Sequence, residues 1–135
     1  MTTTYYDPDH APDPREWLAL DEQERIRLAQ SYHVSVRARL PNLKAHAVFH
    51  AVVENQIATG YGPSCRAVER LQREGLSRHE AIHAIASVVA AFAHESLEGE
   101  RGGGTADAQT PINTAIEALT ASAWNDSAPT WRTGG

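Results

Sequence analysis

The pattern of apolar and polar positions predicts helices over most of the chain. In four segments apolar side chains recur every three or four residues, at 22–40, 42–59, 63–74 and 78–97. Asp21 and Glu24 form a capping box before the first segment, and Pro41 ends it. Gly75 follows the third segment as a C-cap, and Ser77 precedes the fourth as an N-cap. The sequence therefore predicts an all-α fold, a small helical bundle of about four core helices.

The two ends of the chain differ in character from this central part. Residues 1–13 contain prolines and two adjacent tyrosines, which predicts an extended N-terminal arm with aromatic anchors. Residues 99–135 begin with a glycine-rich stretch that has almost no apolar side chains, and we expect a flexible tail with one short helix at 111–123. Residues 14–98 form the predicted helical domain, which the motifs below mark as metal-binding.

Two pairs of histidines have helical spacing in the second and fourth predicted helices. His46 and His50 are followed by Glu54, and His79 precedes His83 by four residues. Side chains four residues apart share one helix face, about 6 Å from each other, so each pair can close on one metal ion. The face of the first pair also carries apolar residues, which indicates that it packs inward. Buried imidazoles and carboxylates then need one another, water or a metal ion, because each unpartnered group costs several kcal/mol.

Residues 79–83 read His-Glu-Ala-Ile-His and match the zinc-peptidase motif HExxH. In that motif the histidines hold zinc and the glutamate is the general base, so Glu80 is a candidate catalytic residue. Ser77 and Glu80 also have the spacing of a capping box, and we favour a helix cap over a catalytic base as the role of this glutamate. A peptidase needs a third ligand, but His94 lies about 16 Å farther along the helix and cannot share an ion with His83.

The missing ligands are better sought on the second predicted helix. If the second and fourth helices pack side by side, the two histidine pairs face each other and Glu54 adds a carboxylate. His46 lies about 12 Å from Glu54 along the helix, so both bind directly only if there are two ions. The favoured metal ligands are His50, Glu54, His79 and His83, and His46 is a further candidate ligand. These donors suit zinc, iron or nickel, and we expect a divalent zinc or iron ion.

Two further histidines lie outside the predicted ligand set. His33 follows Tyr32 on the first predicted helix, where a surface position or a role in supporting a ligand is favoured over a direct bond to the ion. His10 belongs to the arm, and we expect it to face solvent.

Composition and charge restrict the class of protein. With 41% hydrophobic and 21% charged residues the chain is typical of soluble proteins, and its formal charge of −5 argues against nonspecific nucleic-acid binding. Basic residues from Arg66 to Arg78 alternate with glutamates and are interpreted as a solvated helix face.

A single cysteine, Cys65, excludes an internal disulfide framework and fits a reducing compartment. Residues 1–14 show no secretory signal, and the longest apolar stretch, 81–93, is too short for a bilayer, so we expect a cytoplasmic protein.

The motifs within residues 46–89 resemble those of an uncharacterised bacterial family known as a domain of unknown function. Its members show H-x-x-x-H-x-x-x-E followed, at similar separation, by H-[DE]-x-x-H. The resemblance implies that the histidines belong to one site, and it implies no particular reaction. Hemerythrin-like proteins and helical metal-dependent hydrolases of the DNA-damage-inducible type share less of the pattern, and they are analogies at the level of the fold.

The sequence predicts a helical metal-binding protein and leaves its reaction open. As an enzyme it would be a metal-dependent hydrolase, in which the ion activates a water molecule and Glu80 or Glu54 accepts the proton. The alternatives are a non-enzymatic iron or oxygen-binding module, a structural zinc module, and a metal-free protein that pairs as a homodimer. A small-molecule substrate cannot be named from the chain.

Overall fold

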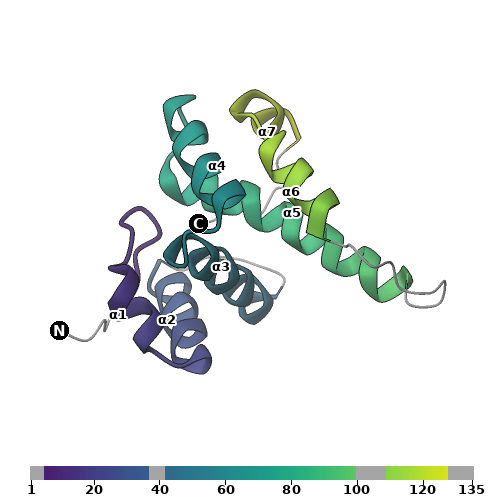
Figure 1. Cartoon of the computed structure of the whole chain (residues 1–135). Coiled ribbons are helices and arrows are strands. Elements are labelled where there is room, and N and C mark those ends of the chain that lie inside the picture. The colour runs from purple at the N-terminus through teal and green to yellow at the C-terminus, as the bar shows by residue number, and fades with distance from the viewer. Residues whose placement is uncertain (1–4, 37–41, 100–108, 128–135) are drawn as a thin grey trace.

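The computed structural model describes residues 5–36, 42–99 and 109–127. These residues form seven helices, shown in Figure 1, and the described ranges contain an isolated bridge between Asp7 and His10 but no strand. The predicted all-α bundle is confirmed. The helices are α1 (Pro14–Ala19), α2 (Glu22–Ser35), α3 (Leu43–Ala58), α4 (Gly62–Arg73), α5 (Arg78–Gly99), α6 (Gln109–Glu117) and α7 (Ala121–Ser127).

Short polar side chains begin the helices where the sequence predicts them. The Asp21 carboxylate accepts the backbone N–H of Glu24 at 2.8 Å at the start of α2. At the start of α5 the Ser77 hydroxyl accepts the N–H of Glu80 at 3.1 Å. Each bond satisfies a backbone donor that has no partner within the helix, which fixes the first turn. The capping role predicted for Ser77 is therefore confirmed.

Two glycines end α3 and α4 in the same way. Gly60 has a φ of +78° and Gly75 a φ of +108°, a region that side chains with a Cβ disfavour. At the end of α4, the N–H of Leu76 donates to the carbonyl of Leu71 at 3.0 Å. This six-to-one bond, together with the bond from Gly75 to Gln72, defines a Schellman motif. The predicted C-cap at Gly75 is confirmed.

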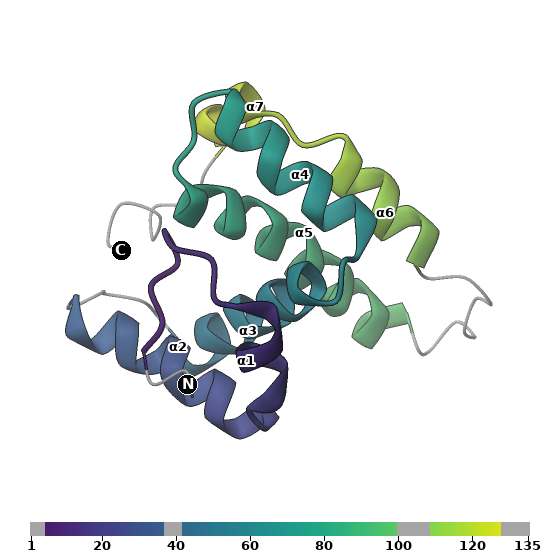
Figure 2. The same ribbon diagram turned by 60° about the vertical axis from the view of Figure 1, so that its left-hand side comes forward.

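Helix α3 lies between two apolar clusters. Figures 1 and 2 show α1 and α2 on one side of α3, with α4, α6 and α7 on the other side. Ala51 and Val53 are two positions apart and point in nearly opposite directions, so α3 contributes to both clusters. The cluster toward α2 contains Tyr6, Trp17, Leu28, Ala29, Ala47 and Ala51. The larger cluster toward α5 includes Val53, Leu71, Ile82, Ile85, Ile116 and Trp124.

Residues 109–127, which lie within the predicted tail, form two helices that pack on the bundle. Helices α6 and α7 occupy residues 109–127, where the sequence predicts one short helix at 111–123. Ile116 is fully buried, and Ala121 and Trp124 are almost fully buried, all within the larger cluster. Arg70 of α4 donates to the carbonyls of Ile116 and Leu119. These contacts make α6 and α7 part of the bundle.

The described part of the N-terminal arm, residues 5–13, folds back onto the bundle. It turns at residues 7–10, where the N–H of His10 donates to the carbonyl of Asp7 at 2.9 Å. Tyr6 is buried at 2% exposure and packs against Trp17 and Tyr32. The predicted aromatic anchor is therefore Tyr6, whereas Tyr5 is exposed. His10 faces solvent, as expected.

Candidate metal centre

Three imidazole nitrogens from two helices meet at one point. The Nε2 atoms of His46 and His50 on α3 are 3.1 Å apart. The Nε2 atom of His83 on α5 lies 3.0 Å from His50 and 3.1 Å from His46. His46 and His50 are one turn apart and His83 faces them from the neighbouring helix, so the predicted packing of the two helices brings these three residues together.

The hydrogen bonds behind His50 fix which of its nitrogens carries a proton. Its Nδ1 lies 3.0 Å from the Tyr6 hydroxyl, and that hydroxyl donates its one proton to Glu54 at 2.6 Å. The Tyr6 oxygen must therefore accept from His50, which places the imidazole proton on Nδ1. A neutral His50 then presents a bare lone pair at Nε2, toward the other two nitrogens.

A fourth histidine, His33 of α2, adds a second bare nitrogen to this group. Its Nδ1 lies 2.7 Å from the carbonyl of Ala29, which can only accept, so Nδ1 carries the proton. Its Nε2 is buried and has no hydrogen-bond partner among the described residues. One nitrogen from each of the four residues lies within 4.8 Å of the others: His33, His46, His50 and His83. The surface position considered for His33 is excluded because its side chain is fully buried.

Glu54, a predicted ligand, is placed behind the histidines and is held by an arginine. Its two carboxylate oxygens each accept from Arg78 at 2.8 Å, and one of them also accepts from Tyr6. Both partners are buried, with side-chain exposures of 1% for Glu54 and 8% for Arg78. The interpretation of Arg78 as part of a solvated helix face is therefore wrong. A carboxylate in this position supports His50 through Tyr6 and is absent from the converging group.

His79 and Glu80 also lie outside the four converging residues. The ring of His79 contacts His83 and His50, with centroids 4.2 and 5.3 Å apart, and its Nε2 is buried without a partner in the described ranges. Glu80 accepts a hydrogen bond from the indole N–H of Trp124 at 2.7 Å. Glu80 thus supports the contact between α5 and α7, while His79 borders the histidine group without joining it.

Burial keeps the imidazoles neutral near pH 7. Burial, together with the neighbouring His33 and His79, lowers the pKa of His46 to about 3. Burial, with His33 close by, lowers the pKa of His79 to about 4. The pKa of His50 is well below its usual value, chiefly because the ring is buried. Neutral imidazoles are the form that binds metal ions.

The geometry of the three Nε2 atoms fits a transition-metal ion. Zinc binds imidazole nitrogen at about 2.0–2.1 Å, which separates two ligand nitrogens of a tetrahedral site by about 3.3 Å. The observed separations of 3.0–3.1 Å are close to that value. A point that is about 2.1 Å from all three nitrogens lies about 1 Å outside the plane that they define. An ion at this point would have room for one more ligand, either His33 or a water molecule.

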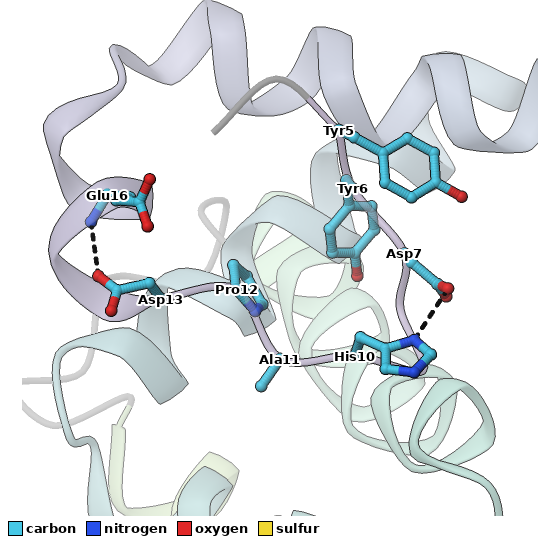
Figure 3. Close-up of a pocket in the computed structure, with 8 residues that line it drawn as sticks. All are labelled: Tyr5, Tyr6, Asp7, His10, Ala11, Pro12, Asp13 and Glu16. Atoms are coloured by element: carbon cyan, nitrogen blue, oxygen red, sulfur yellow. Dashed lines mark hydrogen bonds and ion pairs between the residues drawn. The ribbon is translucent and has the colours of Figure 1, made fainter. Parts of the chain in front are cut away.

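The arm covers this group on one side, and a hollow lies beside the arm. The hollow has a volume of about 440 Å³. Figure 3 shows Tyr6 among the residues that line it and the hydrogen bond between Asp7 and His10. His33, His50 and His83 are buried, whereas His46 is half-buried. The histidine group therefore comes nearest to solvent at His46.

Two residues that shape the group, Tyr6 and Arg78, were not identified as site residues from the sequence, and His33 was considered but left outside the predicted ligand set. A signal existed for His33, which lies four positions after the apolar Ala29 and so shares an inward face with it. Tyr6 and Arg78 reach the site through contacts across 44 and 24 positions of sequence. Nothing in their local pattern indicates such contacts.

Comparison of the chain with protein-family models, with curated proteins and with solved structures finds no significant match. Among the described helices, none combines the length and apolar character that crossing a bilayer requires.

Proposed function

We propose that this protein binds one divalent transition-metal ion, with zinc the favoured metal, through His33, His46, His50 and His83. The ion would lie among the Nε2 atoms of the last three residues, and the buried Nε2 of His33 would complete the coordination. Tyr6, Glu54 and Arg78 would support the site from behind His50.

The contact of three nitrogens is the observation that carries this proposal. His50 Nε2 has no proton to donate, so hydrogen bonds among the three depend on His46 and His83. If both carry a proton on Nε2, those two N–H groups oppose each other at 3.1 Å. If one or neither does, at least one pair of bare lone pairs meets at 3.0–3.1 Å. A cation among the nitrogens replaces every such repulsion with an attraction.

The position of Glu54 favours zinc over non-haem iron. Iron(II) oxygenases commonly use two histidines and one carboxylate as ligands. Here the carboxylate of Glu54 is engaged by Arg78 and Tyr6, which leaves a donor set made of imidazoles. Zinc accepts such a set in tetrahedral geometry without any preference for a carboxylate.

The test is elemental analysis and thermal unfolding of the tag-free full chain. We expect the freshly purified protein to contain close to one equivalent of zinc. After treatment with a chelator, zinc at about 100 times its Kd stabilises the fold by about 2.7 kcal/mol, which raises Tm by roughly 10 °C. Less than a tenth of an equivalent of any metal, with no change in Tm on adding zinc, iron(II) or nickel, contradicts the proposal.

A pair of histidine variants separates the site from adventitious binding. His46→Ala removes the half-buried ligand, whose loss disturbs packing least, and we expect zinc affinity to fall at least 100-fold. His10→Ala removes an exposed histidine outside the site and serves as the matched control, with unchanged affinity. Equal losses in the two variants would show that zinc binds elsewhere.

Metal-dependent hydrolysis stays a prediction from the sequence. The two carboxylates considered as bases have other partners, because Glu54 pairs with Arg78 and Glu80 accepts from Trp124. We therefore propose that imidazoles bind the ion, and we assign no carboxylate as a catalytic base. The cytoplasmic location, the homodimer and the resemblance to the bacterial family likewise stay predictions.

A further inference from the structure

The N-terminal arm is bound to the residues around the histidine group through polar contacts. The Tyr6 hydroxyl bonds to both His50 and Glu54. The carbonyl of Pro8 accepts from Arg78 at 2.8 Å, and the Asp9 carboxylate accepts the N–H of His79 at 3.0 Å. Three arm residues, Tyr6, Pro8 and Asp9, thus bond to α3 or to the first turn of α5, the two helices that carry three of the candidate ligands.

Tyr6 differs from the other aromatic residues near the site because its hydroxyl touches a candidate ligand. Its ring is buried and its oxygen accepts from His50 Nδ1 while donating to Glu54. Tyr32 packs against the rings of Tyr6, His33 and His79, but its hydroxyl takes no part in this chain of bonds. The two tyrosines thus share one aromatic cluster, and of their two hydroxyls it is that of Tyr6 that bonds to a candidate ligand.

We infer that Tyr6 is a positioning residue for the metal ligand His50, so that docking of the arm and binding of the ion stabilise each other. This inference rests on the proposed function. It assigns Tyr6, Pro8 and Asp9 of the arm to the wall of the metal centre, where their hydrogen bonds to α3 and α5 hold the arm in place, and it leaves the exposed His10 outside that wall.

The direction of the coupling follows from the proton on His50. A cation at Nε2 withdraws electron density from the ring, which makes the Nδ1 proton a stronger donor to the Tyr6 oxygen. The bond between His50 and the arm is therefore stronger with the ion than without it. By linkage, an arm held in place raises metal affinity by the same factor.

The first experiment compares Tyr6→Phe with Tyr32→Phe in the full chain. Each variant removes one hydroxyl from a tyrosine of the same aromatic cluster and keeps the ring. We expect zinc affinity, measured by competition with a chromophoric chelator, to fall by about 10–100-fold in Tyr6→Phe and by less than threefold in Tyr32→Phe. The visible absorption bands of cobalt(II) placed in the site should shift only in Tyr6→Phe, a change that a loss of packing alone does not produce.

The second experiment measures hydrogen exchange of the arm amides with and without zinc. The N–H groups of Asp9 and His10 both bond to Asp7 and report on the folded arm. We expect zinc to slow their exchange at least tenfold in the native chain and to slow it less in Tyr6→Phe at saturating zinc.

The outcomes separate the two proposals. If the native chain takes up no zinc, the proposed function fails. If zinc binds but Tyr6→Phe matches Tyr32→Phe in affinity and spectrum, or arm exchange is unchanged by zinc, the coupling is wrong and the metal site stands.

Discussion

Glu54 and Arg78 form a buried, two-bonded ion pair that joins α3 to α5 directly behind the histidines. Both bonds are 2.8 Å long, and the side chains are nearly inaccessible to solvent. Arg78 also donates to Pro8, and Glu54 accepts from Tyr6, so each charge has further partners. A buried pair of this kind fixes the relative position of two helices even where its net contribution to stability is small.

Breaking this pair should be costly. Arg78→Met leaves the Glu54 carboxylate buried without a cation, and we expect the free energy of unfolding to fall by about 3–5 kcal/mol. Urea denaturation of the metal-free protein measures the change. Arg27→Met removes an arginine from the exposed pair with Glu24 and is the matched control, expected to leave the stability nearly unchanged.

A double variant shows why Arg78→Met destabilises the fold: because the attraction between the two side chains is lost, or because the Glu54 carboxylate stays buried without a counter-charge. Glu54→Gln combined with Arg78→Met removes both charges and keeps an acceptor for the Tyr6 hydroxyl. We expect the double variant to be more stable than Arg78→Met alone. A double variant as unstable as the sum of its single variants would show that the charges act independently.

Helical periodicity is sufficient to predict that the side chains of His46, His50 and His83 meet. His46 and His50 share a face of α3, and an apolar stripe on α5 carries His83 inward, so packing of the two stripes brings the imidazoles together. The same periodicity placed Glu54 beside His50 with equal weight. Periodicity alone does not show that His50 joins the converging nitrogens while Glu54 does not, because the Glu54 carboxylate bonds to Arg78 of the neighbouring helix.

The missed features depend on distant contacts. Tyr6 lies in a segment without periodicity, and its burial follows from packing against Trp17 and Tyr32. The apolar positions around Ile116 have the spacing of an amphipathic helix, but this spacing alone does not predict that the helix packs on α4 and α5. The local pattern thus identifies helices and their inward faces, while the partner of each face is decided by tertiary packing.

A core substitution in α6 tests whether the region after α5 is part of the folded bundle. Ile116 is fully buried in the larger cluster, so Ile116→Ala should lower the free energy of unfolding by about 2–4 kcal/mol. Thr114→Ala, at an exposed position of the same helix, should change it by at most about 0.5 kcal/mol. Denaturant unfolding at fixed pH measures both. Equal and negligible effects would support the flexible tail predicted from the sequence.

The metal-free protein should lose stability as the pH falls below about 6.5. The pKa values of His46, about 3, and of His79, about 4, are below the ordinary histidine value because burial disfavours the charged ring. Between pH 6.5 and 4 the unfolded chain therefore binds more protons than the folded one. Each such proton lowers the free energy of unfolding by about 1.4 kcal/mol per pH unit, and this contribution to stability is fully present only above pH 6.5.

Urea midpoints at pH 7.5, 6.0, 5.0 and 4.5, in the presence of a chelator, give this profile. His46→Leu removes one of the titrating rings and should reduce the slope between pH 6 and pH 4.5. A stability that is constant from pH 7.5 to pH 5 without metal would show that the imidazoles are not held neutral by burial.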